Sequence, residues 1–99
     1  MKELILRHYI ATRKRGLITN YTSLQDFLDK MLDEIDEMNA ADVYENTIDG
    51  DMAQEAIDVV CVIFNMLHHF GYDVEHEFRY NVEHQEKRVI YIGSKDIDS

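Results

Sequence analysis

The sequence lacks proline and tryptophan, has one cysteine and four glycines, and contains no long hydrophobic run. Without proline, nothing in the chain forces an interruption of a helix from within. The lone Cys61 excludes an intramolecular disulfide and fits a reducing cytosol, so we expect a cytoplasmic protein. No apolar stretch approaches the ~18 residues of a membrane span and no signal-peptide pattern is present, so we expect no membrane association.

Basic residues are also scarce: ten stand against 20 acids, a formal net charge of -10 over 99 residues. This balance argues against binding a nucleic acid polymer, which requires a basic surface. The length predicts one domain covering residues 1–99, with about 93–99 as a loose tail. Apolar residues make up 45%, which is too many for a disordered acidic chain.

The charges are unevenly distributed along the chain. Residues 1–15 hold five bases and one acid, a net of +4, whereas residues 26–58 hold twelve acids and one base, a net of -11. A run of acids is usually a solvated helix face. The alternative is that some of these acids point inward, and helical periodicity distinguishes the two.

Apolar spacing predicts four helices and therefore an all-α fold of the four-helix-bundle type. The residues after the last helix favour a short strand or an extended arm at 89–92. The third helix is apolar almost all round, so it should be the central element, and four short helices cannot enclose it without at least a homodimer. The expected helices span residues 2–15, about 22 to 40, 51–70 and 73–88, with a polar connector at 42–50.

Several residues are expected to define the helix ends. Thr22 with Gln25 has capping-box spacing, and Asp51 is interpreted as a helix cap. Gly71 fits the left-handed position after the third helix. Asp73 should then cap the fourth helix, whose inward side chains would be Val74, Phe78 and Val82.

Some carboxylates fall on the wrong faces for solvated acids. Glu34 follows Phe27 by seven residues, so it lies at the edge of the apolar stripe of the second helix, and Glu37 flanks it. On the third helix one narrow polar stripe is interrupted only by Val62. It consists of Asp51, Glu55, Asp58, Asn65 and His69, and for the last two a satisfied interface group and a nucleotide contact both remain open.

Two acid pairs on the inward faces of consecutive helices would repel each other unless they took up protons or held a cation. Carboxylate ligands without clustered Cys or His select Mg²⁺, Mn²⁺ or Ca²⁺ over zinc. The spacing alone leaves open both a metal site and an acidic surface without a ligand. The candidate metal ligands are Glu34, Glu37, Glu55 and Asp58.

Residues 33–37 and 55–58, which read DEIDE and EAID, resemble the EExxE…ExxD signature of the MazG-like all-α nucleotide pyrophosphohydrolases. Asp33 stands where that signature has its first Glu. The resemblance extends over most of the chain and includes Lys30 before the acidic motif and Tyr80-Asn81 before a charged stretch. The family's metal ligands correspond to the four carboxylates that the helical wheel selects.

The resemblance implies a helical dimer or tetramer that requires Mg²⁺, with Mn²⁺ as a second option. Its implied reaction is hydrolysis of a nucleoside triphosphate, often a deoxynucleotide, to the monophosphate and pyrophosphate. Glu34 or Glu37 would act as the catalytic base. The residues expected to hold phosphates or sugar are Lys30, Asn81, Lys87 and Arg88.

One departure from the family pattern concerns the fourth helix. The family usually continues from the Asn with a Lys and an Arg, whereas His84 and Glu86 stand near those places here and Lys87-Arg88 are displaced. Two alternatives therefore stay open: a catalytically weak or inactive module that binds nucleotide or a protein partner, and an oligomeric helical protein whose acids only solvate it.

Overall fold

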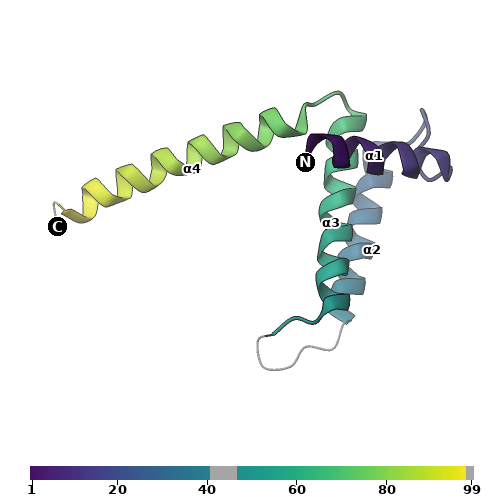
Figure 1. The fold of residues 1–99 in the computed structure, drawn as a ribbon, viewed down its shortest axis with the longest axis horizontal. Helices are drawn as coiled ribbons and strands as arrows, with labels where there is room; N and C mark the ends of the chain where they lie inside the picture. The colour runs from purple at the N-terminus through teal and green to yellow at the C-terminus, as the bar shows by residue number, and fades with distance from the viewer. Residues whose placement is uncertain (41–46, 98–99) are drawn as a thin grey trace.

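The computed structural model describes residues 1–40 and 47–97, and over these residues the chain forms four α-helices and no strand (Figure 1). The all-α prediction is therefore confirmed. The connector predicted at 42–50 lies mostly outside the described residues. The helices are α1 (Lys2–Lys14), α2 (Leu24–Ala40), α3 (Gly50–His69) and α4 (Val74–Ile97).

The start of α2 differs from the predicted capping box. Ser23 Oγ accepts a hydrogen bond from the Asp26 backbone N–H at 3.1 Å, and the Asp26 carboxylate accepts one from the Ser23 N–H at 2.9 Å. Thr22 instead accepts a bond from the Thr19 N–H at 2.8 Å, in the connection before the helix. The reciprocal box therefore lies one residue later than predicted, because an Asp at the third helical position closes it as well as Gln.

The prediction for the start of α3 is wrong, and the prediction for the turn after its end is confirmed. Asp49, rather than Asp51, is the N-cap, since its side chain accepts a bond from the Met52 N–H at 2.8 Å. Asp51 lies within the first turn, where its charge faces the positive end of the helix dipole. Gly71 has a φ of 87° after the helix, and Asp73 accepts a bond from the N–H of His76 at 3.1 Å.

α3 is the central helix, as its composition predicts. α2 and α3 lie side by side and run in opposite directions, while α1 crosses them near the C-terminal end of α3 (Figure 1). α3 is in contact with each of the other three helices. The longest interface is with α2, so polar groups on the facing sides of these two helices are forced together.

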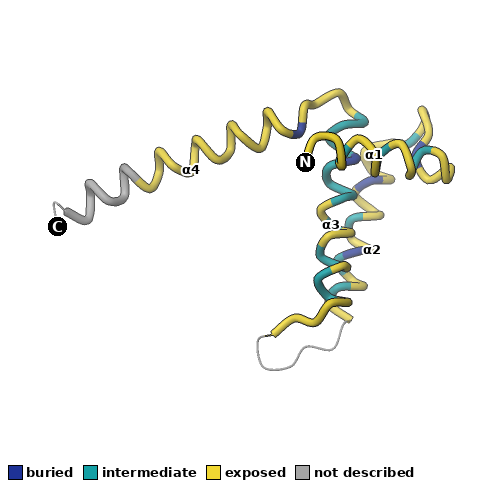
Figure 2. Tube along the Cα trace, in the orientation of Figure 1, coloured by how far each residue is buried: buried dark blue, intermediate teal, exposed yellow. Residues whose placement is uncertain are grey.

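The buried set is small and includes polar residues. Ile18, Phe27 and Val74 are the buried apolar side chains among the residues whose burial is described, 1–40 and 47–89 (Figure 2). The Phe27 ring lies 5.2 Å from the His69 ring, centroid to centroid, at the junction of α2 and α3. Glu34 and Asn65 are also buried, which is unusual for a charged group and an amide and singles out their surroundings as a site.

α4 extends away from the other three helices (Figure 1). It continues to Ile97, so the predicted end near Arg88 and the strand or arm at 89–92 are wrong, and residues 93–97 are helical rather than a tail. Without proline, and without a strand to pair with in the described chain, the helix satisfies its own backbone. No helix among the described residues is long and apolar enough to cross a membrane.

The predicted inward face of α4 is covered only at its start. Val74 is buried, as expected, but Phe78 is 65% exposed and Val82 is 39% exposed, so their prediction is wrong for a single chain. The radius of gyration is 17.4 Å, against about 13 Å for a compact chain of this length. Phe78 and Val82, on the apolar side of α4, are therefore left uncovered by the described part of one chain.

Candidate metal centre and adjoining pocket

Three of the four predicted metal ligands meet between α2 and α3. Glu34 and Glu37 come from α2, and Glu55 comes from α3. Each offers a carboxylate oxygen, and these oxygens lie within 4.8 Å of one another. Glu34 reaches this position because it follows the buried Phe27 by two helical turns, which places it on the same seam.

The cluster contains oxygens that no protein donor satisfies. Oε2 of Glu34 and Oε2 of Glu55 are buried and accept no hydrogen bond. A carboxylate oxygen buried in this way is costly unless a proton or a cation serves it. The donor set consists of hard oxygens alone, which suits Mg²⁺ or Mn²⁺. The residues present therefore fit a divalent cation, held by the three carboxylates.

Lys30 compensates part of the negative charge. Its Nζ lies 2.8 Å from Oε1 of Glu34, and this hydrogen bond is the main cause that raises the pKa of Lys30. Repulsion from Glu34, with lost hydration and the charge of Glu55, raises the pKa of Glu37 above its ordinary value. Three carboxylates and one ammonium leave a charge of -2 when all are ionised, which one divalent cation would balance.

Asp58, the fourth predicted ligand, is not part of this close group among the described residues. It is exposed and lines a pocket of about 430 Å³ together with Lys30 and Glu34. Burial of the thiol, and to a lesser extent the charge of Asp58, raise the pKa of Cys61, which also lines the pocket. Cys61 is thus a protonated, half-buried thiol rather than an activated nucleophile.

The polar stripe of α3 continues from the carboxylates into this pocket. Val62 and Asn65 line it beyond Asp58, and Ile18 and Phe27 contribute apolar wall. Asn65 is only 4% exposed, and its Nδ2 lies 3.2 Å from Nδ1 of His8 on α1. The Oδ1 atom of Asn65 has no hydrogen-bond partner.

His69, the last residue of the stripe, has a structural role. Its Nδ1 lies 2.9 Å from the hydroxyl of Tyr9, which in turn accepts a bond from the Arg13 guanidinium at 3.3 Å. His68, beside it, packs edge-on against the Tyr9 ring at 4.5 Å. These contacts attach α1 to the C-terminal end of α3, so the interface interpretation of His69 is supported.

Sequence patterns did not identify the contribution of α1 to the pocket. His8, Thr12 and Arg15 line it. The net +4 of residues 1–15 was the available signal. This net charge did not show which basic side chains of α1 would face the pocket, because that depends on the packing of α1 against α3.

The remaining predicted substrate residues lie elsewhere. Asn81, Lys87 and Arg88 are exposed on α4, and none of them lines the pocket beside the carboxylates. α4 extends away from the other three helices (Figure 1). In one chain the structure therefore brings Lys30 to the candidate metal centre and does not bring the other three.

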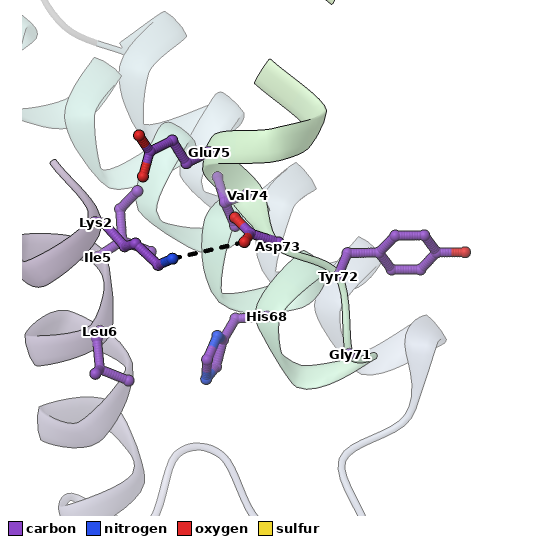
Figure 3. Close-up of a pocket in the computed structure, with 9 residues that line it drawn as sticks. All are labelled: Lys2, Ile5, Leu6, His68, Gly71, Tyr72, Asp73, Val74 and Glu75. Atoms are coloured by element: carbon purple, nitrogen blue, oxygen red, sulfur yellow. Dashed lines mark ion pairs between the residues drawn. The ribbon is translucent and has the colours of Figure 1, made fainter. Parts of the chain in front are cut away.

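A second pocket, of about 320 Å³, lies between α1 and the turn that joins α3 to α4 (Figure 3). Ile5, Leu6 and Val74 form apolar parts of its wall, and Lys2 forms an ion pair with Asp73 at 3.6 Å. Asp73 is also the helix cap of α4, so its carboxylate already has partners within the protein. This pocket contains none of the predicted site residues.

Fold and site together define an all-α protein with a cluster of three carboxylates, one of them buried, between two antiparallel helices and a pocket beside it. Comparisons of the chain with protein-family models, with curated proteins and with solved structures find no match. The MazG-like resemblance thus stays a prediction, based on residues 33–37 and 55–58 of the sequence.

Proposed function

We propose that the protein is a Mg²⁺-dependent nucleoside triphosphate pyrophosphohydrolase, which cleaves an NTP or dNTP to the monophosphate and pyrophosphate. The observation that carries the proposal is the group of three carboxylates within 4.8 Å of one another, with buried oxygens that lack donors. A triphosphate is anionic, so an acidic pocket accepts it only together with a cation. The adjoining pocket of about 430 Å³ supplies room for the rest of a nucleotide.

Glu34, Glu37 and Glu55 would hold the Mg²⁺, with Asp58 as the fourth ligand and Mn²⁺ as a substitute metal. When bound, such an ion neutralises phosphate charge and lowers the pKa of a coordinated water. Glu37 is exposed and its pKa is raised, so it is the better placed of the two candidate bases to take up a proton. Glu34 is buried and bound to Lys30, which favours a ligand role for it.

Release of pyrophosphate from a panel of NTPs and dNTPs with Mg²⁺ tests this proposal directly. We expect Glu55→Gln and Asp58→Asn to abolish turnover, because each removes a ligand charge. Asp36→Asn is the matched control: it removes one charge from α2 at an exposed position outside the cluster, and should leave turnover unchanged. Absence of pyrophosphate release from every nucleotide, or full activity in Glu55→Gln, would refute the proposal.

A homodimer or homotetramer belongs to the same proposal. The chain exposes 8060 Å², whereas a folded monomer of 11.7 kDa should expose about 5,900 Å². The excess of roughly 2,200 Å² per chain is in the range that obligate dimers bury. Phe78 and Val82 on α4, and Ile57 and Val60 on α3, contribute exposed apolar surface to it. A cytoplasmic location is proposed with it, because the thiol of Cys61 is free.

A non-catalytic module that binds nucleotide or a protein partner is the second candidate function. The position of α4 favours it, since Asn81, Lys87 and Arg88 do not line the pocket of their own chain. Any substrate contact from them would require α4 of a second copy. Saturable nucleotide binding in calorimetry without pyrophosphate release would support this candidate, and turnover that is lost in Glu55→Gln would exclude it.

A further inference from the structure

α1 contacts the other helices through a narrow part of its surface. None of its residues is buried, and the half-buried ones are Ile5, Tyr9, Thr12 and Arg13. A pocket lies against each half of the helix. Ile5 lines the pocket of about 320 Å³ at the turn after α3 (Figure 3), and Thr12 lines the pocket of about 430 Å³ beside the carboxylates. The packing of α1 on α3 is therefore concentrated between the two pockets, at Tyr9.

Tyr9 is the centre of a chain of hydrogen bonds that joins α1 to its surroundings. Its hydroxyl lies 2.9 Å from Nδ1 of His69 on α3 and accepts a bond from the Arg13 guanidinium at 3.3 Å. The same guanidinium donates to Oδ1 of Asn20 at 2.8 Å, in the connection between α1 and α2. A hydroxyl can donate as well as accept, so its contact with His69 is possible for either tautomer of the ring.

The other polar contacts between α1 and α3, or the turn after it, lie at the surface of α1. Nδ2 of Asn65 is 3.2 Å from Nδ1 of His8, which is exposed, and Lys2 forms an ion pair of 3.6 Å with Asp73. Both side chains of that pair are more than half exposed, and exposed pairs contribute little to stability. Because elements with few buried contacts open at a small cost in free energy, α1 should separate from the other helices before they unfold.

We propose that α1 is a movable wall of the nucleotide pocket, and that the Tyr9 hydroxyl is the positioning group that holds this wall against α3. His8, Thr12 and Arg15 of α1 line the pocket, whereas the three clustered carboxylates belong to α2 and α3. Release of α1 would therefore open the pocket and leave the candidate metal centre intact. The inference deepens the proposed function and rests on it for the identity of the ligand that enters.

Hydrogen exchange of the full chain, measured by mass spectrometry, tests whether α1 opens separately. We expect α1 amides to exchange faster than those of α2 and α3. Tyr9→Phe keeps the ring that packs on His68 at 4.5 Å and removes only the hydroxyl. It should accelerate exchange in α1 alone by about 3- to 10-fold, the range for the loss of one hydrogen bond. A purely structural Tyr9 would instead accelerate exchange in α1, α2 and α3 by the same factor, through global unfolding.

Cys61 reports whether the pocket opens together with α1. It is the only thiol of the chain, and it lines the pocket in a half-buried position. Its alkylation by N-ethylmaleimide should accelerate in Tyr9→Phe by about the same factor as exchange in α1. An unchanged alkylation rate, together with faster α1 exchange, would mean that α1 frays without opening the pocket, and would overturn the inference.

Two further variants serve as control and cross-check. Tyr21→Phe removes the hydroxyl of a tyrosine that is 93% exposed in the connection before α2, and it should leave exchange and alkylation unchanged. His69→Phe keeps an aromatic ring beside Phe27 and removes Nδ1, so it should accelerate α1 exchange as Tyr9→Phe does. Since both variants remove one and the same contact, the double variant should exchange no faster than either single variant. Multiplied effects would contradict the role of this contact.

The outcomes distinguish this inference from the proposed function. Faster exchange confined to α1 and faster Cys61 alkylation in Tyr9→Phe, without pyrophosphate release from any triphosphate, would support the movable wall and refute the enzyme. Pyrophosphate release by a chain in which α1 exchanges no faster than α3, or in which Tyr9→Phe accelerates both helices equally, would support the enzyme and overturn the movable wall.

Discussion

The substitution Glu55→Gln tests whether like-charge repulsion between α2 and α3 is held in check by a cation. Oxygens of Glu34 and Glu55 lie within 4.8 Å of each other, a separation at which two charges repel by about 3 kcal/mol at an effective dielectric constant of 20. Lys30 and the solvent around the half-buried Glu55 screen much of this energy. We therefore expect the cation-free variant to be more stable than wild type by about 1 kcal/mol.

The same variant should respond less to Mg²⁺, because it has lost a ligand. A change of 1 kcal/mol corresponds to about 4–8 °C in Tm for a domain of this size. A tenfold loss of affinity removes about 1.4 kcal/mol of the stabilisation at saturating Mg²⁺. Wild type and variant should consequently exchange their order of Tm when EDTA is replaced by Mg²⁺.

Thermal unfolding by circular dichroism, with EDTA or with Mg²⁺ at constant ionic strength, measures both effects. Asp36→Asn is the control, since it removes the same charge from an exposed position on α2 and should shift Tm equally in both buffers. If Glu55→Gln has a lower Tm than wild type in EDTA and an undiminished response to Mg²⁺, the repulsion argument is wrong.

Three further predictions follow from individual residues. The pKa of Glu37 is raised in the fold, so without a bound cation the free energy of unfolding should increase as the pH falls through that pKa toward the ordinary value of 4.5. Urea titrations at several pH values measure this increase, and Glu37→Gln should flatten it. Asp49→Ala should cost about 1 kcal/mol of unfolding free energy through loss of the α3 cap, whereas Asp51→Ala should cost only a few tenths; equal losses would contradict the capping assignment. In equilibrium sedimentation the wild type should have at least the mass of a dimer, and Phe78→Glu should shift it toward the monomer; a monomeric wild type would refute the oligomer.

Most of the helical framework followed from local patterns in the chain. The apolar spacing that includes Phe27 predicted α2, and Gly71 and Asp73 marked the turn between α3 and α4 because a positive φ and an N-cap are local requirements. The wrong prediction of the α3 cap also has a local cause. Two neighbouring acids were each able to cap α3, and the structure uses Asp49 rather than Asp51.

The candidate site was predictable to the extent that it depends on helix faces. Glu34, Glu37 and Glu55 were selected because their spacing places them on inward edges of consecutive helices, and the antiparallel pairing of α2 and α3 brings them together. Asp58 shares the stripe but not the close group, since a position one turn further along α3 faces the pocket instead. Periodicity predicts on which face of its helix a residue lies, but it does not predict which residues of the partner helix it will lie against.

The sequence by itself determined the elements: four helices, an almost wholly apolar α3 and an excess of acid on the seam between α2 and α3. These depend on the 3.6-residue period and on capping groups a few residues away. Three features were decided only by the tertiary structure. α1 supplies His8 and Arg15 to the pocket, and Oδ1 of Asn65 is left without a donor. α4 extends away from the other helices of its own chain, so most of its surface is exposed. Those features depend on how helices cross, which is set by contacts between residues distant in the sequence.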